Sequence, residues 1–169
     1  MNRFFWPTAA MLLAVAAVPT ARAEESQGAL APRVMFVAFR VADLERSLHF
    51  YTQILGMREY GRYPGEGSQK DVALTFATDV GGAEPTDSGA MLLLIPREAG
   101  AGPVQHGDAH SRIAFGVPDV PGVVASAKQA GHEVTREPTR IADGNRWVAF
   151  VRDPDGYHLE LLGPATPGS

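Results

Sequence analysis

A single carboxylate stands inside an apolar stretch near the end of the chain. Glu160 lies between Leu159 and Leu161, in a run from Tyr157 to Leu162 that is predicted to be a strand. Such strands rarely contain an acid, and a buried carboxylate commonly binds a ligand or moves a proton. His158 lies two residues earlier and therefore shares the face of Glu160. Two interpretations of Glu160 stay open: a functional carboxylate, or a solvent-facing side chain on a strand with one exposed face.

These residues belong to a predicted β-hairpin. Val148–Val151 is a short run of strand-forming residues, and Asp153-Pro154-Asp155-Gly156 is typical of a tight turn, because Pro fixes one φ angle and Gly adopts positive φ. Trp147 comes just before the first strand. Its ring is a candidate for stacking on a ligand, and packing in the core is an equally good interpretation.

Histidines supply the other candidate groups. His106 and His110 flank Asp108 in a Gly-rich segment, and His110 precedes Arg112 by two residues, so the two would share one strand face. The chain has no Cys, which excludes disulfides, thiolate catalysis and Cys-ligated metal.

Composition indicates one soluble domain. The chain has 169 residues, of which 45% are hydrophobic, enough for a single core. The formal net charge is −4, and there is no basic run interleaved with aromatic residues. Nucleic acid is therefore not expected as a partner.

Residues 1–23 are typical of a secretory signal that is cleaved after Ala23. Arg3 is followed by the apolar run Phe4–Val18, and Ala21-Arg22-Ala23 places small residues where signal peptidase requires them. The apolar run is shorter than the roughly 18 residues that a membrane-spanning helix needs. We expect a secreted or periplasmic protein without membrane association after cleavage; an uncleaved N-terminal anchor is the alternative. Residues 24–32 should be a flexible lead-in, and residues 165–169 a tail.

The first half of the domain, residues 33–96, is predicted to contain a strand, a helix and three further strands. The helix is indicated by Leu44, Leu48, Tyr51 and Leu55, which recur at helical spacing after the N-cap residue Asp43 and before Gly56. The strands are expected at Val34–Val41, Met57–Tyr63, Val72–Thr78 and Ala90–Ile95.

The second half, residues 110–164, repeats the first after a linker at residues 97–109. Arg112–Val120 aligns with Phe36–Leu44, with Ala, Phe, Val and Asp at the same spacing. A helix at Val120–Ala130, a strand at Glu133–Arg136, a turn at Ile141–Arg146 and the hairpin follow. The repeat predicts an α+β domain over residues 33–164, built from two tandem βαβββ modules that form a curved mixed sheet around a cleft.

Two stretches resemble the vicinal oxygen chelate superfamily, which has the glyoxalase and bleomycin-resistance fold. Phe39–Tyr51 with Leu55-Gly56-Met57 is similar to the first strand, helix and turn of that family, and Val148–Leu162 is similar to its last hairpin. Both stretches look closest to glyoxalase I. The resemblance covers residues 34–162 and implies the fold, which hosts several chemistries.

The resemblance also implies where a metal would be bound. Enzymes of the superfamily hold a divalent metal with side chains from four strands, which in glyoxalase I are His and Glu. The matching positions here are Phe36, Leu93, Arg112 and Glu160, and the internal repeat independently pairs Phe36 with Arg112 and Leu93 with Glu160.

Only Glu160 among these four residues has a side chain that could bind a metal ion. Phe and Leu have no donor atom, and the guanidinium of Arg stays protonated. We expect Arg112 to form an ion pair with Glu160 across the cleft, with the cation standing where the metal would be. A small shift in alignment would make His110 a possible ligand instead. Ring-cleaving dioxygenases of the superfamily need two His and one Glu to bind iron, and these four positions contain no His, so that activity is not expected either.

Arg40 matches a family position that contacts the γ-glutamyl carboxylate of glutathione in glyoxalase I. A guanidinium on a strand that faces a cleft suits bidentate carboxylate binding. A surface salt bridge to Glu45 is the alternative.

Two functions are weighed. The first is an exported glyoxalase-like protein with a degenerate metal site that binds a small organic ligand in the cleft, as bleomycin-resistance proteins do. Its ligand-binding residues would be Phe36, Arg40, Leu93, Arg112, Trp147 and His158. The alternative is an active enzyme of the lactoylglutathione lyase (glyoxalase I) type, acting on a glutathione–aldehyde adduct with Glu160 as general base. A divalent metal, Ni or Zn, would be its cofactor. A homodimer is expected on the resemblance alone.

Overall fold

The computed structural model describes residues 34–64, 70–77, 89–108, 110–141 and 144–165. The predicted signal segment and lead-in lie outside the described residues, as does the tail except for Ala165. Residues 33–169 form one compact unit. Among the described helices, none has the length and apolar character needed to cross a membrane.

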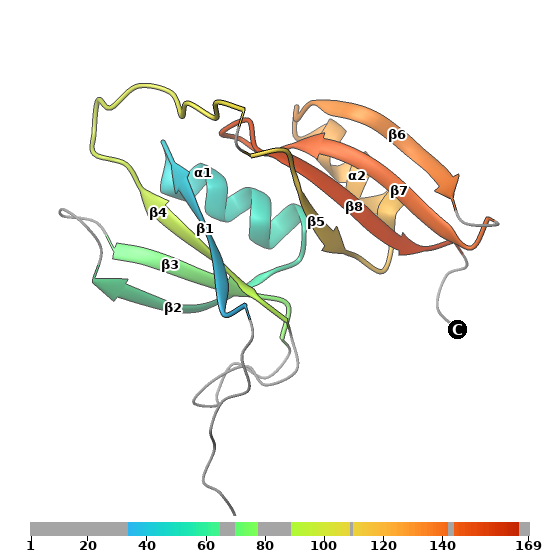
Figure 1. The fold of residues 1–169 in the computed structure, drawn as a ribbon, viewed down its shortest axis with the longest axis horizontal. Coiled ribbons are helices and arrows are strands. Elements are labelled where there is room, and N and C mark those ends of the chain that lie inside the picture. The colour runs from blue at the N-terminus through green and yellow to red at the C-terminus, as the bar shows by residue number, and fades with distance from the viewer. Residues whose placement is uncertain (1–33, 65–69, 78–88, 109, 142–143, 166–169) are drawn as a thin grey trace, which may run out of the picture. The chain divides into compact units, whose positions relative to one another are not determined.

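The first half forms a four-stranded mixed sheet with the strand order β1-β4-β3-β2 (Figure 1). Strand β1 is parallel to β4, and the other neighbours are antiparallel. A short α-helix continues directly into a π-helical segment. In chain order the elements are β1 (Phe36–Val41), α1 (Leu44–His49), η1 (Phe50–Ile54), β2 (Arg58–Pro64), β3 (Lys70–Thr75) and β4 (Met91–Pro96).

The second half repeats this topology with the strand order β5-β8-β7-β6 and a parallel β5–β8 pair. Its elements are β5 (Ile113–Gly116), α2 (Val120–Gln129), β6 (Val134–Ile141), β7 (Arg146–Arg152) and β8 (His158–Pro164). The predicted α+β fold of two tandem βαβββ modules is therefore confirmed. The strands form two four-stranded sheets, one in each module.

Both helices begin as their sequences predict, but the predicted first helix is α-helical only to His49 and continues as the π-helical segment to Ile54. The side chains of Asp43 and Asp119 accept hydrogen bonds from the backbone N–H of Arg46 and Gly122 respectively, which satisfies one free donor at each N-terminus. Gly56, after the π-helical segment, has a φ angle of 78°, a conformation that only Gly adopts without strain.

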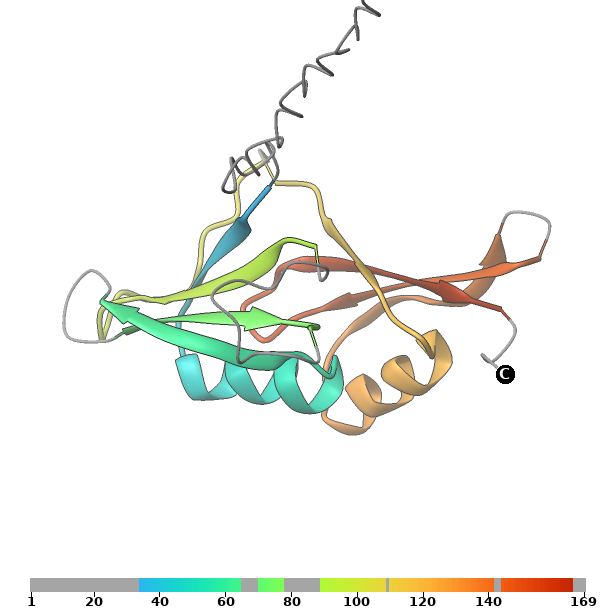
Figure 2. The same ribbon diagram turned by 90° about the horizontal axis from the view of Figure 1, so that it is seen from below.

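Each sheet has one face covered by its helix and one face without a helix among the described elements (Figure 2). In β1, Phe39 and Val41 point into the core with exposed fractions of 2% and 0%, whereas Phe36 is 52% exposed. Leu92 and Leu94 of β4 alternate with the half-buried Leu93 in the same way. We call the helix-free sides the outer faces.

Some predicted boundaries need correction. The strand predicted at Glu133–Arg136 runs to Ile141, because β6 is an edge strand in which Pro138 and polar residues are tolerated beside two register shifts. The strand predicted at Val72–Thr78 lies at Lys70–Thr75 instead. Both hairpin strands are longer than predicted.

Candidate functional site

The two sheets place the predicted ligand positions in equivalent registers. Ala38 of β1 lies opposite Leu93 of β4, and Ala114 of β5 lies opposite Glu160 of β8. Phe36 precedes Ala38 by two residues, as Arg112 precedes Ala114. The pairing derived from the internal repeat therefore agrees with the strand register.

Arg112 and Glu160 form an ion pair. Nε of Arg112 donates to Oε2 of Glu160 over 2.7 Å, and the two side chains are 50% and 17% exposed. The pair was expected to bridge the cleft, but β5 and β8 are neighbouring strands of one sheet, so it is formed within the second module.

Phe150 supplies an aromatic surface beside this pair. It lies opposite Glu160 in the β7–β8 register and therefore shares its outer face. The guanidinium carbon of Arg112 is 5.8 Å from the ring centroid of Phe150, and that of Arg136, from β6, is 5.7 Å away. These distances allow cation–π attraction.

His158 lies at the edge of the same group. Its Nε2 is 2.8 Å from Oγ1 of Thr135, and its ring centroid is 5.2 Å from that of Phe150. Partial burial, together with the positive charges of Arg152 and Arg112, lowers the pKa of His158. We call Arg112, Arg136, Phe150, His158 and Glu160 the β8 cluster.

The other predicted ligand-binding residues lie apart from this cluster. Phe36 and Leu93 are on the first sheet, and none of the described hydrogen bonds, ion pairs or ring contacts joins them to Arg112 or Glu160. Arg40 shares the outer face of Phe36 by strand alternation, and its backbone N–H and carbonyl both bond to the hydroxyl of Tyr157, each over 3.1 Å.

The structure does not bring Trp147 together with Glu160. Trp147 lies on β7 opposite Gly163, three positions before Phe150. Because side chains alternate along a strand, Trp147 points to the helix side of the sheet, whereas Phe150 points to the outer face. Trp147 packs against the core, with the guanidinium of Arg140 at 4.9 Å from its ring.

His110 is also separate from the β8 cluster. Its ring packs edge-on against Phe39 and Tyr157, with both centroid distances at 5.7 Å, and its Nε2 atom is buried without a hydrogen-bond partner. His110 therefore does not contact Glu160. Arg112 is the residue that pairs with Glu160, so the structure does not support a shifted alignment with His110 at the ligand position.

A pocket of about 380 Å³ lies between the first module and β5. None of the predicted cleft residues is among those that line it, which are largely apolar: Val37, Met57, Phe76, Ala90, Met91, Leu92, Ile113, Ala114, Phe115 and Gly116. A pocket between the modules thus exists, but its lining differs from the predicted one.

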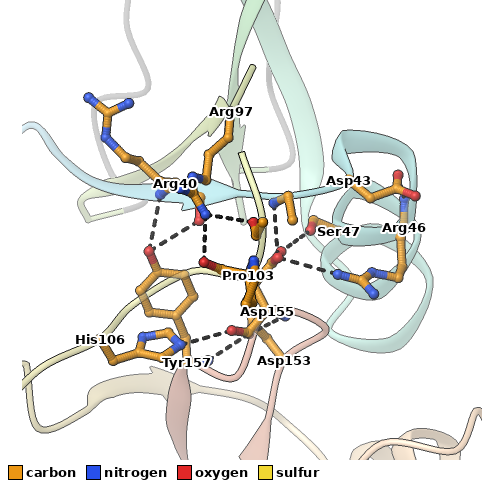
Figure 3. A network of polar contacts seen from close by, with 12 residues as sticks. Arg40, Asp43, Arg46, Ser47, Arg97, Pro103, His106, Asp153, Asp155 and Tyr157 are labelled. Atoms are coloured by element: carbon orange, nitrogen blue, oxygen red, sulfur yellow. Dashed lines mark hydrogen bonds and ion pairs between the residues drawn. The ribbon is translucent and has the colours of Figure 1, made fainter. Parts of the chain in front are cut away.

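Sequence reasoning missed a polar network that joins the hairpin turn to the first module (Figure 3). The Asp155 carboxylate accepts hydrogen bonds from the N–H of Ala42 and the hydroxyl of Ser47, both over 2.9 Å, and from Nη2 of Arg46 over 3.3 Å. The sequence indicated only that Asp153-Pro154-Asp155-Gly156 is a turn. It could not indicate the partners of Asp155, because they lie more than 100 residues away in the chain.

Asp153 is a second buried acid of this network. It is 4% exposed and accepts hydrogen bonds from the Tyr51 hydroxyl over 2.7 Å and from the backbone N–H of Asp155 and Tyr157. Burial raises its pKa to about 6, despite the opposing effect of these hydrogen bonds. Tyr51, whose pKa burial raises well above its ordinary value, stays protonated and donates. We call the contacts of Asp153 and Asp155 the inter-module latch.

The residues present do not fit the metal of the family. Two of the four positions offer hydrocarbon side chains, and the third offers the guanidinium of Arg112, already paired with the single carboxylate. Across the described ranges, His, Asp and Glu form no group of three or more that is suited to a metal ion.

Curated proteins similar to this chain include several named lactoylglutathione lyase. The chain is 35% identical over 130 residues to a probable lactoylglutathione lyase of Vibrio cholerae, covering 77% of this chain and 89% of that protein. It is 33% identical to the lactoylglutathione lyase of Escherichia coli O157:H7, with coverage of 77% and 91%.

Solved structures show the same likeness. The trypanothione-dependent glyoxalase I of Leishmania major matches with a TM-score of 0.59 and 31% identity, over 79% of this chain and 87% of that one. A glyoxalase I mutant of Zea mays matches with a TM-score of 0.65 and 27% identity, over 79% of this chain and 46% of the longer plant chain. The family model of the Glyoxalase/Bleomycin resistance protein/Dioxygenase superfamily matches residues 33–161. Fold, repeat and sequence agree, and the chain belongs to this superfamily.

Proposed function

We propose that this chain is a glyoxalase-family protein that binds a small organic molecule at the β8 cluster and does so without a divalent metal. The observation that carries this proposal is the Arg112–Glu160 ion pair, which occupies two of the four positions where the family binds its metal. Phe36 and Leu93, at the other two positions, lie on the first sheet apart from the cluster and have no donor atom, whereas Phe150 supplies apolar surface beside the ion pair. A site with a few polar groups and much apolar surface suits a small organic ligand.

Metal content and ligand binding together test this proposal. The protein is incubated with Ni, Zn, Co, Mn and Fe(II), freed of excess metal and analysed by mass spectrometry. In parallel, EDTA-treated protein is screened by thermal melting against a library of small organic acids and neutral analogues. We expect no stoichiometric metal and at least one ligand that raises the melting temperature in EDTA. Stoichiometric metal whose retention depends on Glu160 would overturn the proposal.

Lactoylglutathione lyase activity is the second candidate, and the comparisons favour it, because the curated relatives described above carry that name. In this case Glu160 would take the proton from the carbon of a glutathione–aldehyde adduct that bears the hydroxyl and the sulfur, and return it to the former carbonyl carbon. The hydroxyl proton would pass to the former carbonyl oxygen, which leaves a thioester beside a new hydroxyl. Arg112 would stabilise the negative charge that develops on the oxygen. Arg40, which matches the family position for a glutathione carboxylate, would bind that end of the adduct.

Turnover of the adduct of glutathione and methylglyoxal separates the two candidates. Formation of lactoylglutathione by the wild-type protein, lost in Glu160→Gln and retained in the exposed control Glu59→Gln, would establish the lyase. If Glu160→Gln leaves the turnover unchanged, Glu160 is not the base. Turnover that disappears with EDTA and returns with Ni or Zn would show a metal that the described donor set does not predict.

A further inference from the structure

The Arg112–Glu160 pair leaves half of each partner unused. Nε of Arg112 and Oε2 of Glu160 are joined, but the two terminal nitrogens of Arg112 and Oε1 of Glu160 form no hydrogen bond with any described residue. Arg112 therefore presents a free pair of donors next to a free carboxylate oxygen.

Another arginine–glutamate pair of the same chain is closed. Nε and Nη2 of Arg62 donate to the two oxygens of Glu59 over 2.8 and 2.9 Å, the parallel arrangement that saturates a carboxylate. That pair is held between residues of one edge strand. The open geometry of Arg112 and Glu160 is thus a property of their places, just before β5 and on β8, and not of their residue types.

The surroundings of the open pair favour an anion with an apolar body. Arg136 lies on the ring of Phe150 and has no ion pair within the described part of the chain. Arg112 and Arg136 together outnumber Glu160 by one positive charge. Phe150 is half-buried, and its ring centroid is less than 6 Å from the guanidinium carbons of both Arg112 and Arg136, so it offers apolar surface beside the free donors.

We propose that the open pair is a binding site for a 2-hydroxycarboxylate with an apolar or aromatic substituent. This inference rests on the proposed function of metal-free ligand binding and names its ligand class. The ligand carboxylate accepts hydrogen bonds from the terminal nitrogens of Arg112, its neighbouring hydroxyl donates to Oε1 of Glu160, and its substituent packs on Phe150.

The hydroxyl is the feature that selects this class. A simple carboxylate would satisfy Arg112 but bring its negative charge beside Oε1 of Glu160 with no donor between them. A hydroxyl on the adjacent carbon places a donor at that oxygen. An ester of the same compound lacks the negative charge that matches the guanidinium groups.

Three related probes test the assignment by titration calorimetry on EDTA-treated, full-length protein. Mandelate has both groups, phenylacetate lacks the hydroxyl, and methyl mandelate lacks the carboxylate charge. We expect mandelate to bind about tenfold more tightly than phenylacetate, the effect of one hydrogen bond to a charged group. Methyl mandelate should show no saturable binding, and mandelate should bind more weakly as the salt concentration rises.

Two variants of the pair locate the site. Arg112→Lys keeps the positive charge beside Glu160 but loses the planar fork, and should weaken mandelate binding at least about tenfold. Glu160→Gln removes the charged acceptor and should reduce the preference for mandelate over phenylacetate to less than about threefold. Arg62→Gln, which opens the closed pair on β2, is the matched control and should bind mandelate like the wild type. Melting curves identify any variant that fails to fold, and Arg112→Gln then replaces Arg112→Lys.

The outcomes separate this inference from the proposed function. Equal affinity for mandelate and phenylacetate, unchanged binding by Arg112→Lys, or no mandelate binding would overturn the inference, whereas a different ligand found in EDTA would leave the proposed function standing. Mandelate binding that requires stoichiometric metal would overturn both.

Discussion

The side chain of Asp153 lies under the turn of the last hairpin, where solvent does not reach it. Its pKa is raised from 3.8 to about 6, chiefly by burial. Between these two values the folded protein holds a proton on Asp153 that the unfolded chain has released. The stability contributed by this group is therefore complete below about pH 4 and is lost as the pH rises through 6.

We predict that Asp153→Asn removes this pH dependence. The side chain keeps its shape but no longer titrates, so the free energy of unfolding should fall less than that of the wild type between pH 4 and pH 7. The difference between the two proteins should change by at most about 3 kcal/mol over this range. Urea unfolding at several pH values measures it. Two parallel stability profiles would show that Asp153 titrates with the same pKa in both states.

Individual residues of the candidate site and of the hairpin turn show which contacts the sequence could predict. The Arg112–Glu160 ion pair could be predicted because the repeat and the resemblance fixed their positions. Trp147 was placed with the ligand, but it lies three positions from Phe150 on one strand, and an odd spacing puts two side chains on opposite faces. The partners of Asp155 could not be predicted, because hydrogen bonds between residues over 100 positions apart leave no local pattern.

At the scale of elements, the start of α1 depends on the last hairpin. Asp155, whose side chain is 2% exposed, satisfies the N–H of Ala42 and the hydroxyl of the fully buried Ser47. Asp155→Ala should leave the buried hydroxyl of Ser47 without its acceptor and reduce stability by about 2–3 kcal/mol. Asp43→Ala, at the same helix terminus, removes one exposed hydrogen bond and should cost about 1 kcal/mol.

Urea unfolding of the two variants tests this difference. The prediction fails if Asp155→Ala is no more destabilising than Asp43→Ala, which would mean that water satisfies Ala42 and Ser47 as well as the carboxylate does.

The backbone of β8 at Gly163 lies very close to the residues around the start of α2. A Cβ atom at Gly163 of β8 would overlap the carbonyl oxygen of Val117 and lie 2.9 Å from Cγ2 of Val120. Gly163→Ala should therefore destabilise the protein by about 1–3 kcal/mol. At Gly116 a Cβ atom meets nothing within 4 Å, so Gly116→Ala should change stability by less than about 0.5 kcal/mol. Equal melting temperatures for the two variants would show that β8 and the start of α2 move apart readily.

The boundaries of the elements were predicted best where apolar alternation is strong. Strand β4 is apolar throughout and lies within one residue of its predicted range. Strand β6 was predicted four residues long because Pro138 and charged residues interrupt the pattern, and it has eight. An edge strand needs neither two apolar faces nor every backbone donor, so its full length depends on its neighbour β7.

At the scale of the whole molecule, the outer face of the first sheet supports the homodimer that we propose from the family resemblance. Phe36 is 52% exposed and lies beside Met91 in the β1–β4 register. Because a carboxylate without a partner is costly to bury at an interface, Phe36→Glu should shift the protein toward monomer. Sedimentation velocity at several concentrations measures this, with Tyr63→Glu at the distant edge strand as the control. A wild-type protein that remains monomeric would contradict the proposal.

The inter-module latch has a consequence for the order in which the chain is made. Synthesis proceeds from the N-terminus, and the first helix appears long before the turn that completes its start, since Ser47 and Asp155 are 108 positions apart. The first module therefore cannot reach its final stability until nearly the whole polypeptide is available. A chain that stops before Asp153 lacks the partners of Tyr51 and Ser47, and a cell's proteases should remove it. Truncated chains without the last hairpin should therefore be digested faster than chains that contain it.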